Sequence, residues 1–206
     1  MLAGTELRAN GNLGVGIYFD KVGYLAPAVY THFVRKFEAQ QDVIVFFHLR
    51  QLIAPTVMPQ PSNSDQTYTD MPQVRHEERF ITQRVGAANT FRIIVRHGYN
   101  DHVFTDDFGT VLYDQLKAFL SSELASHRLP IRERASRDLA ALDAAYEKQV
   151  VYMLGKEELK IRPKGFILKR AALAAFVWMR ENTRTKVQEL NVPIGQLVEV
   201  GYVKEI

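Results

Sequence analysis

Charged and aromatic side chains follow several apolar, strand-like runs of this sequence, where they could bind a ligand. Loops at strand ends often carry binding residues, because the sheet holds them in fixed positions. In α/β sheets, ligands generally bind at the loops that follow the carboxyl ends of the strands. Our candidates for binding a nucleotide or another regulatory ligand are the residues in these places: Asp20, Lys21, Arg96, His97, Tyr99, Asp101 and Lys156.

Each of these places also has a purely structural explanation. Gly98 and the pair Asn100–Asp101 are ordinary turn residues, so a turn explains that polar segment equally well. Gly155 followed by Lys156 could present backbone N–H groups to an anion, but a glycine after a strand usually marks a turn. His48 lies inside an apolar run and fits a core or interface histidine better than a metal ligand.

The sequence GNLGVG at 11–16 is superficially similar to a dinucleotide-binding loop. Its glycines precede and interrupt the first predicted strand, whereas such a loop follows the strand and opens a helix. Close backbone packing at a strand edge explains them better. The sequence contains no P-loop, no HExxH, no GxSxG, and no cysteine for a thiolate metal site. We therefore predict no catalytic residue, no metal site and no cofactor.

Composition favours a globular domain. The 206 residues are 47% hydrophobic, which is enough for a substantial core. The 26 basic residues are interspersed with 23 acidic ones, so we expect no nucleic-acid partner. The longest apolar run, 171–179, is about half of the roughly 20 residues that a membrane span requires, and the N-terminus does not resemble a signal peptide. We expect the isolated domain to be soluble and to face the cytosol.

The hydrophobic pattern predicts alternating strands and helices. We expect a single α/β domain with a mixed, largely parallel sheet, flanked by helices and containing one antiparallel hairpin. The expected elements are a strand at 13–19, a helix after Pro27, a central strand from 43, a hairpin of 79–85 with 91–99, a helix capped by Asp106 or Asp107 and ending near 127, a strand at 150–154 ending at Gly155, an apolar helix at 166–180, and a last strand at 197–203.

Three segments do not fit this alternation. Residues 1–12 read as a leader that is disordered or added to the natural sequence, which leaves 13–206 as the domain. A stretch rich in proline, serine and glutamine near 55–72 indicates a mobile insert. The charged, alanine-rich stretch near 130–148 has only a narrow apolar stripe and indicates an exposed helix or a partly disordered insert.

Several segments, taken together and in order, resemble the C-terminal cytosolic domain of KUP/HAK/KT potassium transporters, especially the fungal members. The segments that carry this resemblance are LGVGIYFDKVG at 13–23, VIVFFHLRQL at 43–52, FRIIVRHGYND at 91–101, VVYMLGKEEL at 150–159 and the last 29 residues, which begin WMRENTRTKV.

The resemblance implies a regulatory and assembly domain that has no reaction of its own. Members of the family join it to membrane helices that take up potassium together with protons, so the transport residues would lie outside this chain. The implied setting is the cytoplasmic face of a membrane, with the membrane domain of the same chain and a second copy as partners, and an adenine nucleotide as a further ligand. The alternative is a freestanding nucleotide-binding module of universal-stress-protein-like architecture. An acyl- or phosphoryl-transfer enzyme lacks any nucleophile and base signature here.

Overall fold

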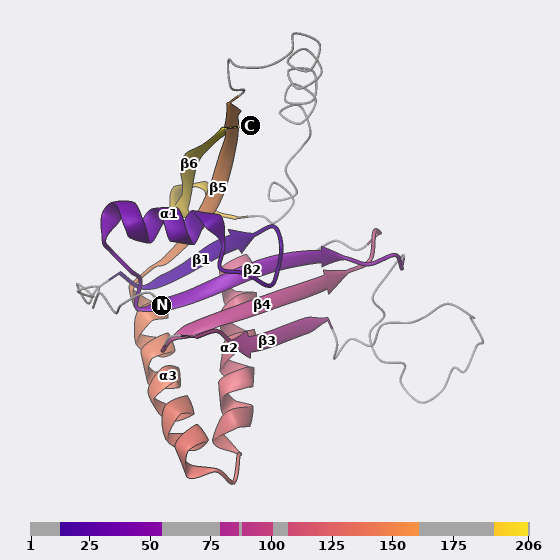
Figure 1. The fold of residues 1–206 in the computed structure, drawn as a ribbon. Helices are drawn as coiled ribbons and strands as arrows, with labels where there is room; N and C mark the ends of the chain where they lie inside the picture. Colours follow the sequence, from indigo (N-terminus) through magenta and orange to yellow (C-terminus); the bar gives the residue numbers. More distant parts are fainter. Residues whose placement is uncertain (1–12, 55–78, 87, 101–106, 161–191, 206) are drawn as a thin grey trace.

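Six strands form one sheet in the order β3-β4-β2-β1-β5-β6 (Figure 1). The computed structural model describes residues 13–54, 79–86, 88–100, 107–160 and 192–205. The strands are β1 (Val15–Asp20), β2 (Val43–Gln51), β3 (Phe80–Arg84), β4 (Thr90–His97), β5 (Val150–Lys160) and β6 (Leu197–Glu205). Neighbouring strands are parallel, except that β3 and β4 form the predicted antiparallel hairpin. The predicted fold class is confirmed.

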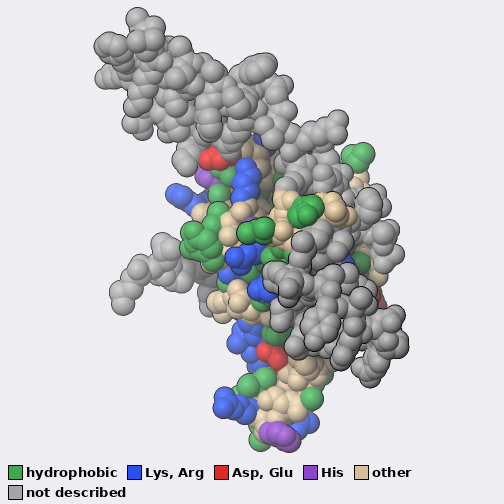
Figure 2. All heavy atoms as spheres, turned by 90° about the vertical axis from the view of Figure 1, so that its right-hand side faces the viewer, with side chains coloured by type: hydrophobic (Ala, Val, Ile, Leu, Met, Phe, Trp, Pro, Cys, Tyr) green, Lys and Arg blue, Asp and Glu red, His purple; other side chains and the backbone are tan. Residues whose placement is uncertain are grey.

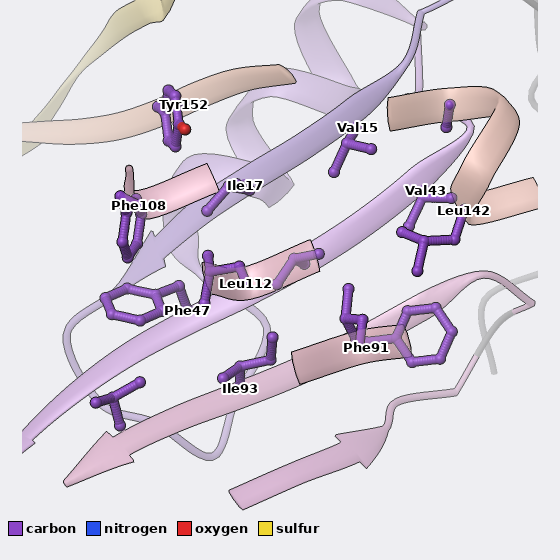
Figure 3. Packing of buried hydrophobic residues seen from close by; sticks show 14 of the residues in the cluster. Val15, Ile17, Val43, Phe47, Phe91, Ile93, Phe108, Leu112, Leu142 and Tyr152 are labelled. Atoms are coloured by element: carbon purple, nitrogen blue, oxygen red, sulfur yellow. The ribbon is translucent and has the colours of Figure 1, made fainter. Parts of the chain in front are cut away.

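Helices cover both faces of this sheet. Helix α1 (Ala28–Phe37) packs against β1, β5 and β6, where Val29 joins the apolar side chains of one face. Helices α2 (Phe108–Leu124) and α3 (Leu129–Lys148) lie on the opposite face, over the larger cluster. In that cluster Phe108 contacts both Phe47 and Tyr152 (Figure 3), with ring centroids 4.8 and 5.7 Å apart. The central strands are therefore buried on both faces, which explains their continuous apolar runs.

The two helices of the second face differ in how well the sequence predicted them. Helix α2 begins after Asp107, whose carboxylate accepts a hydrogen bond from the Thr110 N–H at 2.9 Å, as the sequence predicted. The segment expected to be an exposed helix or a partly disordered insert is α3. It is a helix with one buried side, where Leu142 and Ala145 enter the core, and its other side is exposed. The buried side also includes the small residues Ala135 and Ala145, which widen the narrow apolar stripe of the sequence.

Strand β5 is longer than the sequence predicted. It was expected to end at Gly155 but continues to Lys160. Strand β1 pairs only with its first part, from Val150 to Met153, whereas β6 pairs with it from Tyr152 to Lys160. Its far half and β6 thus form a two-stranded ribbon beyond the end of β1 (Figure 1). Gly155 lies inside the strand and not at its end. The absence of a Cβ lets α1 pack closely there, because a Cβ on residue 155 would lie only 3.0 Å from the Cβ of Val29.

Other expectations fall outside the described residues. These are the leader at 1–12, the insert near 55–72, the apolar helix at 166–180 and the candidate residue Asp101. The last predicted strand is confirmed as β6, which follows a short 3-10 helix, Ile194–Gln196. Within the described part of the chain, no helix is long and apolar enough to span a membrane.

Candidate functional site

Asp20 organises the loop that joins β1 to α1. One of its carboxylate oxygens accepts a hydrogen bond from the Val22 N–H at 3.0 Å, and the other accepts one from the Gly23 N–H at 2.8 Å. Aspartate is favoured at such positions because its short side chain reaches backbone groups two or three residues ahead. Both carboxylate oxygens therefore have a structural task in the loop that carries Lys21.

Gly23 and His48 fix this loop onto the neighbouring strand β2. Gly23 has φ +87°, and a Cβ on it would lie 2.6 Å from Cδ2 of His48. Only glycine combines this backbone conformation with so close an approach. The Nδ1 atom of His48 donates a hydrogen bond to the Asp20 carbonyl oxygen at 2.9 Å. This contact gives His48 the structural role that its place in an apolar run indicated.

Arg92 of β4 holds the same loop from the other side of β2. Its side chain is 6% exposed, donates a hydrogen bond from Nη2 to the Leu25 carbonyl oxygen at 2.9 Å, and lies 6.0 Å from the centre of the Phe46 ring. Its Nε has no hydrogen-bond partner. No local sequence pattern marked Arg92 as a candidate site residue. The one feature of the sequence that could have identified Arg92 is that a charged residue stands among the buried positions of an apolar strand.

The end of β4 is fixed by backbone and histidine hydrogen bonds. The Leu52 N–H donates to the His97 carbonyl at 2.8 Å, and the Tyr99 N–H donates to the Ala54 carbonyl at 3.1 Å. The buried His97 ring donates through Nδ1 to the Gly98 carbonyl at 2.8 Å, and its Nε2 has no hydrogen-bond partner. Tyr99 and Asn100 form a turn, which agrees with the structural explanation of this segment.

The structure places most, but not all, of the candidate residues along one edge of the sheet. Asp20 ends β1 and Lys21 follows it. The candidates of β4 lie across the intervening strand β2, about 10 Å to the side, and Arg96 is two residues farther along the sheet than Asp20, which is level with Ile94. Lys156 is not in a loop: it pairs with Gly201 inside the β5–β6 ribbon. Since Gly155 faces Val29 of α1, the alternation of a strand puts Lys156 on the opposite face. The expected loop at 155–157 is therefore wrong, because β6 extends the pairing of β5.

A partly buried ionic cluster lies away from these loops, between β3 and the helices of the second face. The Arg84 guanidinium binds Glu123 of α2, with Nη2 and Oε2 2.6 Å apart, and also binds Asp138 of α3. Burial alone would lower the pKa of Arg84, but hydrogen bonds and charge interactions with the two carboxylates raise it. The cluster ties an edge strand to two helices, and the sequence analysis missed it because its members are far apart in the chain.

Two buried tyrosines have core roles. Burial raises the pKa of Tyr152 to about 12, and burial is also the largest cause that raises the pKa of Tyr18. The hydroxyl of Tyr152 meets Gly109 at the start of α2, and that of Tyr18 donates to the Gln41 side chain. Raised pKa values keep both phenols neutral, so they act as hydrogen-bonding core residues. Among the described residues, no three His, Asp or Glu side chains gather as metal ligands would.

Comparison with known proteins identifies a family to which this chain is similar. Residues 13–206 match the family described as K+ potassium transporter C-terminal domain. The chain is 27% identical to potassium transporter 19 of Oryza sativa subsp. japonica over 94% of its length, and 29% identical to potassium transporter 1 of Arabidopsis thaliana over 92%. It spans only about a quarter of the length of these two relatives. No solved structure matches it.

Proposed function

Since the chain belongs to the K+ potassium transporter C-terminal domain family, we propose that it is the regulatory and assembly domain of a potassium uptake transporter. The observation that carries the proposal is the match over residues 13–206, which includes the whole described sheet and its helices. The family is that of a transporter domain and not of an enzyme. The domain would adjust the transport rate through contacts, with no reaction of its own.

Ion transport itself would be carried out by a membrane part of the same polypeptide. This follows from the length of the relatives, which are potassium transporters of which this chain spans about a quarter. We place the domain at the cytoplasmic face of that membrane and assign potassium binding and proton coupling to the membrane part. The narrower expectation of a fungal member stays a prediction, because the two relatives named above are plant proteins.

A second copy of the chain is the assembly partner that we propose. Strand β6 is at the end of the sheet and pairs with β5, and its Val198 and Val203 are 41% and 59% exposed. Such an edge offers unpaired backbone groups to another chain. Light scattering of the chain at micromolar concentration should give the mass of a dimer, and a monomer mass would contradict this part of the proposal.

A nucleotide ligand is the second candidate function. The observation that favours it is that Lys21 and the candidates of β4 follow the carboxyl ends of parallel strands, where α/β sheets generally bind ligands. Calorimetric titration with ATP, AMP and cyclic dinucleotides should then release or absorb heat, and Lys21→Ala should weaken the binding. A titration without heat for all of these compounds would rule this candidate out.

The main proposal is tested by potassium-dependent growth of transporter-deficient yeast. The longer protein that contains this chain should restore growth, and the same protein truncated before Leu13 should reach the membrane but support altered uptake. If the longer protein reaches the membrane and gives no potassium-dependent growth, the transporter proposal fails. The freestanding nucleotide-binding module would then become the leading alternative.

A further inference from the structure

Exposed apolar side chains gather on the loops at the carboxyl ends of β1, β2 and β4. Within the described residues, eleven large hydrophobic side chains are exposed, and five of them lie on these loops: Val22, Tyr24, Leu25, Ile53 and Tyr99. Ile53 is 101% exposed and Tyr24 is 71% exposed. Single exposed apolar residues are ordinary, but a group of them marks an interaction surface.

These loops lie next to one another although they come from three strands. His48 of β2 donates a hydrogen bond to the Asp20 carbonyl oxygen, and its ring lies against Gly23. The first loop therefore lies beside β2, two residues before Arg50. Tyr99 binds the Ala54 carbonyl, so it lies next to Ile53 at the end of β2. On the side of the molecule toward which these strands end, hydrophobic side chains alternate with those of Lys and Arg (Figure 2).

The charge of this surface is positive. Segments 20–26, 48–54 and 94–100 contain three basic residues, Lys21, Arg50 and Arg96, and one carboxylate, Asp20. Both oxygens of Asp20 accept backbone N–H groups, and its single negative charge leaves the three segments with a formal net charge of +2. Lys21 and Arg50 are exposed, and neither forms an ion pair with the described part of the chain. The surface therefore complements a negatively charged partner.

We propose that this strand-end surface binds the anionic phospholipid headgroups of a membrane. It is defined by Lys21, Tyr24, Leu25, Arg50, Ile53 and Tyr99. Tyrosine places its ring at the headgroup level, aliphatic side chains enter the apolar boundary, and Lys or Arg is attracted to anionic lipid. A purely electrostatic partner would not require four exposed apolar side chains, and a neutral apolar partner would not require the basic ones. The inference rests on the proposed function in one respect: a domain of a transporter lies next to a membrane.

Sedimentation with lipid vesicles tests the proposal directly. The 206-residue chain should sediment with vesicles that contain phosphatidylserine in phosphatidylcholine, and not with vesicles of phosphatidylcholine alone. Added salt should weaken the binding, because ions screen the attraction between exposed charges. Equal binding to both kinds of vesicle, or binding to neither, would overturn the proposal.

Paired variants locate the binding on the molecule. Lys21→Glu with Arg50→Glu should weaken binding by at least fivefold for each basic charge removed, the ratio expected for one charge at an anionic surface. Tyr24→Ser with Ile53→Ser should also weaken it, and all four side chains are exposed enough to replace without loss of the fold. Circular dichroism should confirm that each variant is folded.

The first turn of α3 offers a control on another surface. Leu129 is 66% exposed and Arg132 is exposed nearby on α3, so Leu129→Ser with Arg132→Glu makes the same kinds of change on another surface. This control should bind vesicles like the parent chain. If it weakens binding as much as the strand-end variants, the effect is one of net charge and the proposal is wrong. The assay involves no transport, so its failure leaves the proposed potassium function standing.

Discussion

Gly23 shows how a single residue sets the shape of the loop after β1. Its φ of +87° is unfavourable for any residue with a Cβ, and the added methyl group of alanine would also meet the His48 ring at 2.6 Å. We expect Gly23→Ala to lower the free energy of unfolding by more than 1–2 kcal/mol, the approximate cost of the backbone conformation alone. Urea unfolding measures this change.

Two other glycines separate the causes of that loss. Gly86 has φ +53° with nothing within 4 Å of the place of a Cβ, so Gly86→Ala should incur only the backbone cost. Gly195 has open space and no positive φ, so Gly195→Ala should leave stability nearly unchanged. Losses of equal size at Gly23 and Gly86 would show that the contact with His48 costs nothing.

Tyr152 gives the stability of the protein a specific dependence on alkaline pH. Its pKa is about 12 in the folded chain because of burial, against an ordinary value of 10. Between pH 10 and pH 12 the unfolded chain loses the Tyr152 proton while the folded chain keeps it. The contribution of Tyr152 to the free energy of unfolding is therefore fully present below pH 10 and is lost as the pH rises to 12. The loss should be about 3 kcal/mol.

The variant Tyr152→Phe isolates this contribution. Urea unfolding at several pH values between 9 and 12 should show a shallower decline for the variant than for the parent chain. Parallel curves for the two proteins would contradict the assignment of the slope to Tyr152.

At the scale of elements, the Arg84 cluster connects β3 to α2 and α3. Removing the guanidinium leaves Asp138, which is 4% exposed, with only the longer contact to Arg134 at 3.8 Å. We expect Arg84→Met to lower the free energy of unfolding by about 3–5 kcal/mol. The double variant with Asp138→Leu should lose much less than the sum of the two single losses, because the most deeply buried carboxylate is then absent and the remaining Glu123 side chain is 22% exposed. Urea unfolding measures each variant.

An exposed ion pair provides the control for this prediction. Lys148 and Asp42 are 3.2 Å apart, and the Lys148 side chain is 40% exposed. Lys148→Met should therefore cost less than about 1 kcal/mol. A loss at Arg84 as small as this would show that the cluster does not hold the edge strand.

Sequence patterns predicted the elements whose signals are local. The continuous apolar runs of β1, β2 and β4, the short connection of the hairpin and the aspartate cap of α2 all depend on neighbours in the chain. The length of β5 depends on β6, about forty residues later, and the buried side of α3 includes alanines, which a pattern of large apolar residues does not contain. Such information is absent from local periodicity.

The same distinction applies to the candidate site. Asp20 and Lys21 could be selected because they follow an apolar run, and the sheet indeed puts them at its carboxyl edge. Arg92 and His48 act on residues of a different strand or loop, so only the tertiary structure shows that they shape the β1–α1 loop. The exposure of Ile53 and Tyr24 could not be predicted, because apolar residues of these types are more often buried.

For the whole molecule, the central claim is that this domain sets the rate of a potassium transporter whose ion site lies elsewhere. The fold supports a role in contacts: parallel strands present a basic, apolar surface at one edge, and β6 is an end strand of the described sheet. A domain that acts in this way changes how fast the membrane part works and not how tightly the ion binds.

The most direct test is the initial rate of potassium uptake at a series of potassium concentrations. Transporter-deficient yeast would express either the longer protein or its truncation before Leu13, matched for the amount at the cell surface. We predict a changed maximal rate with an unchanged KM for potassium. Identical kinetics for the two proteins, or a change in KM alone, would contradict the regulatory role.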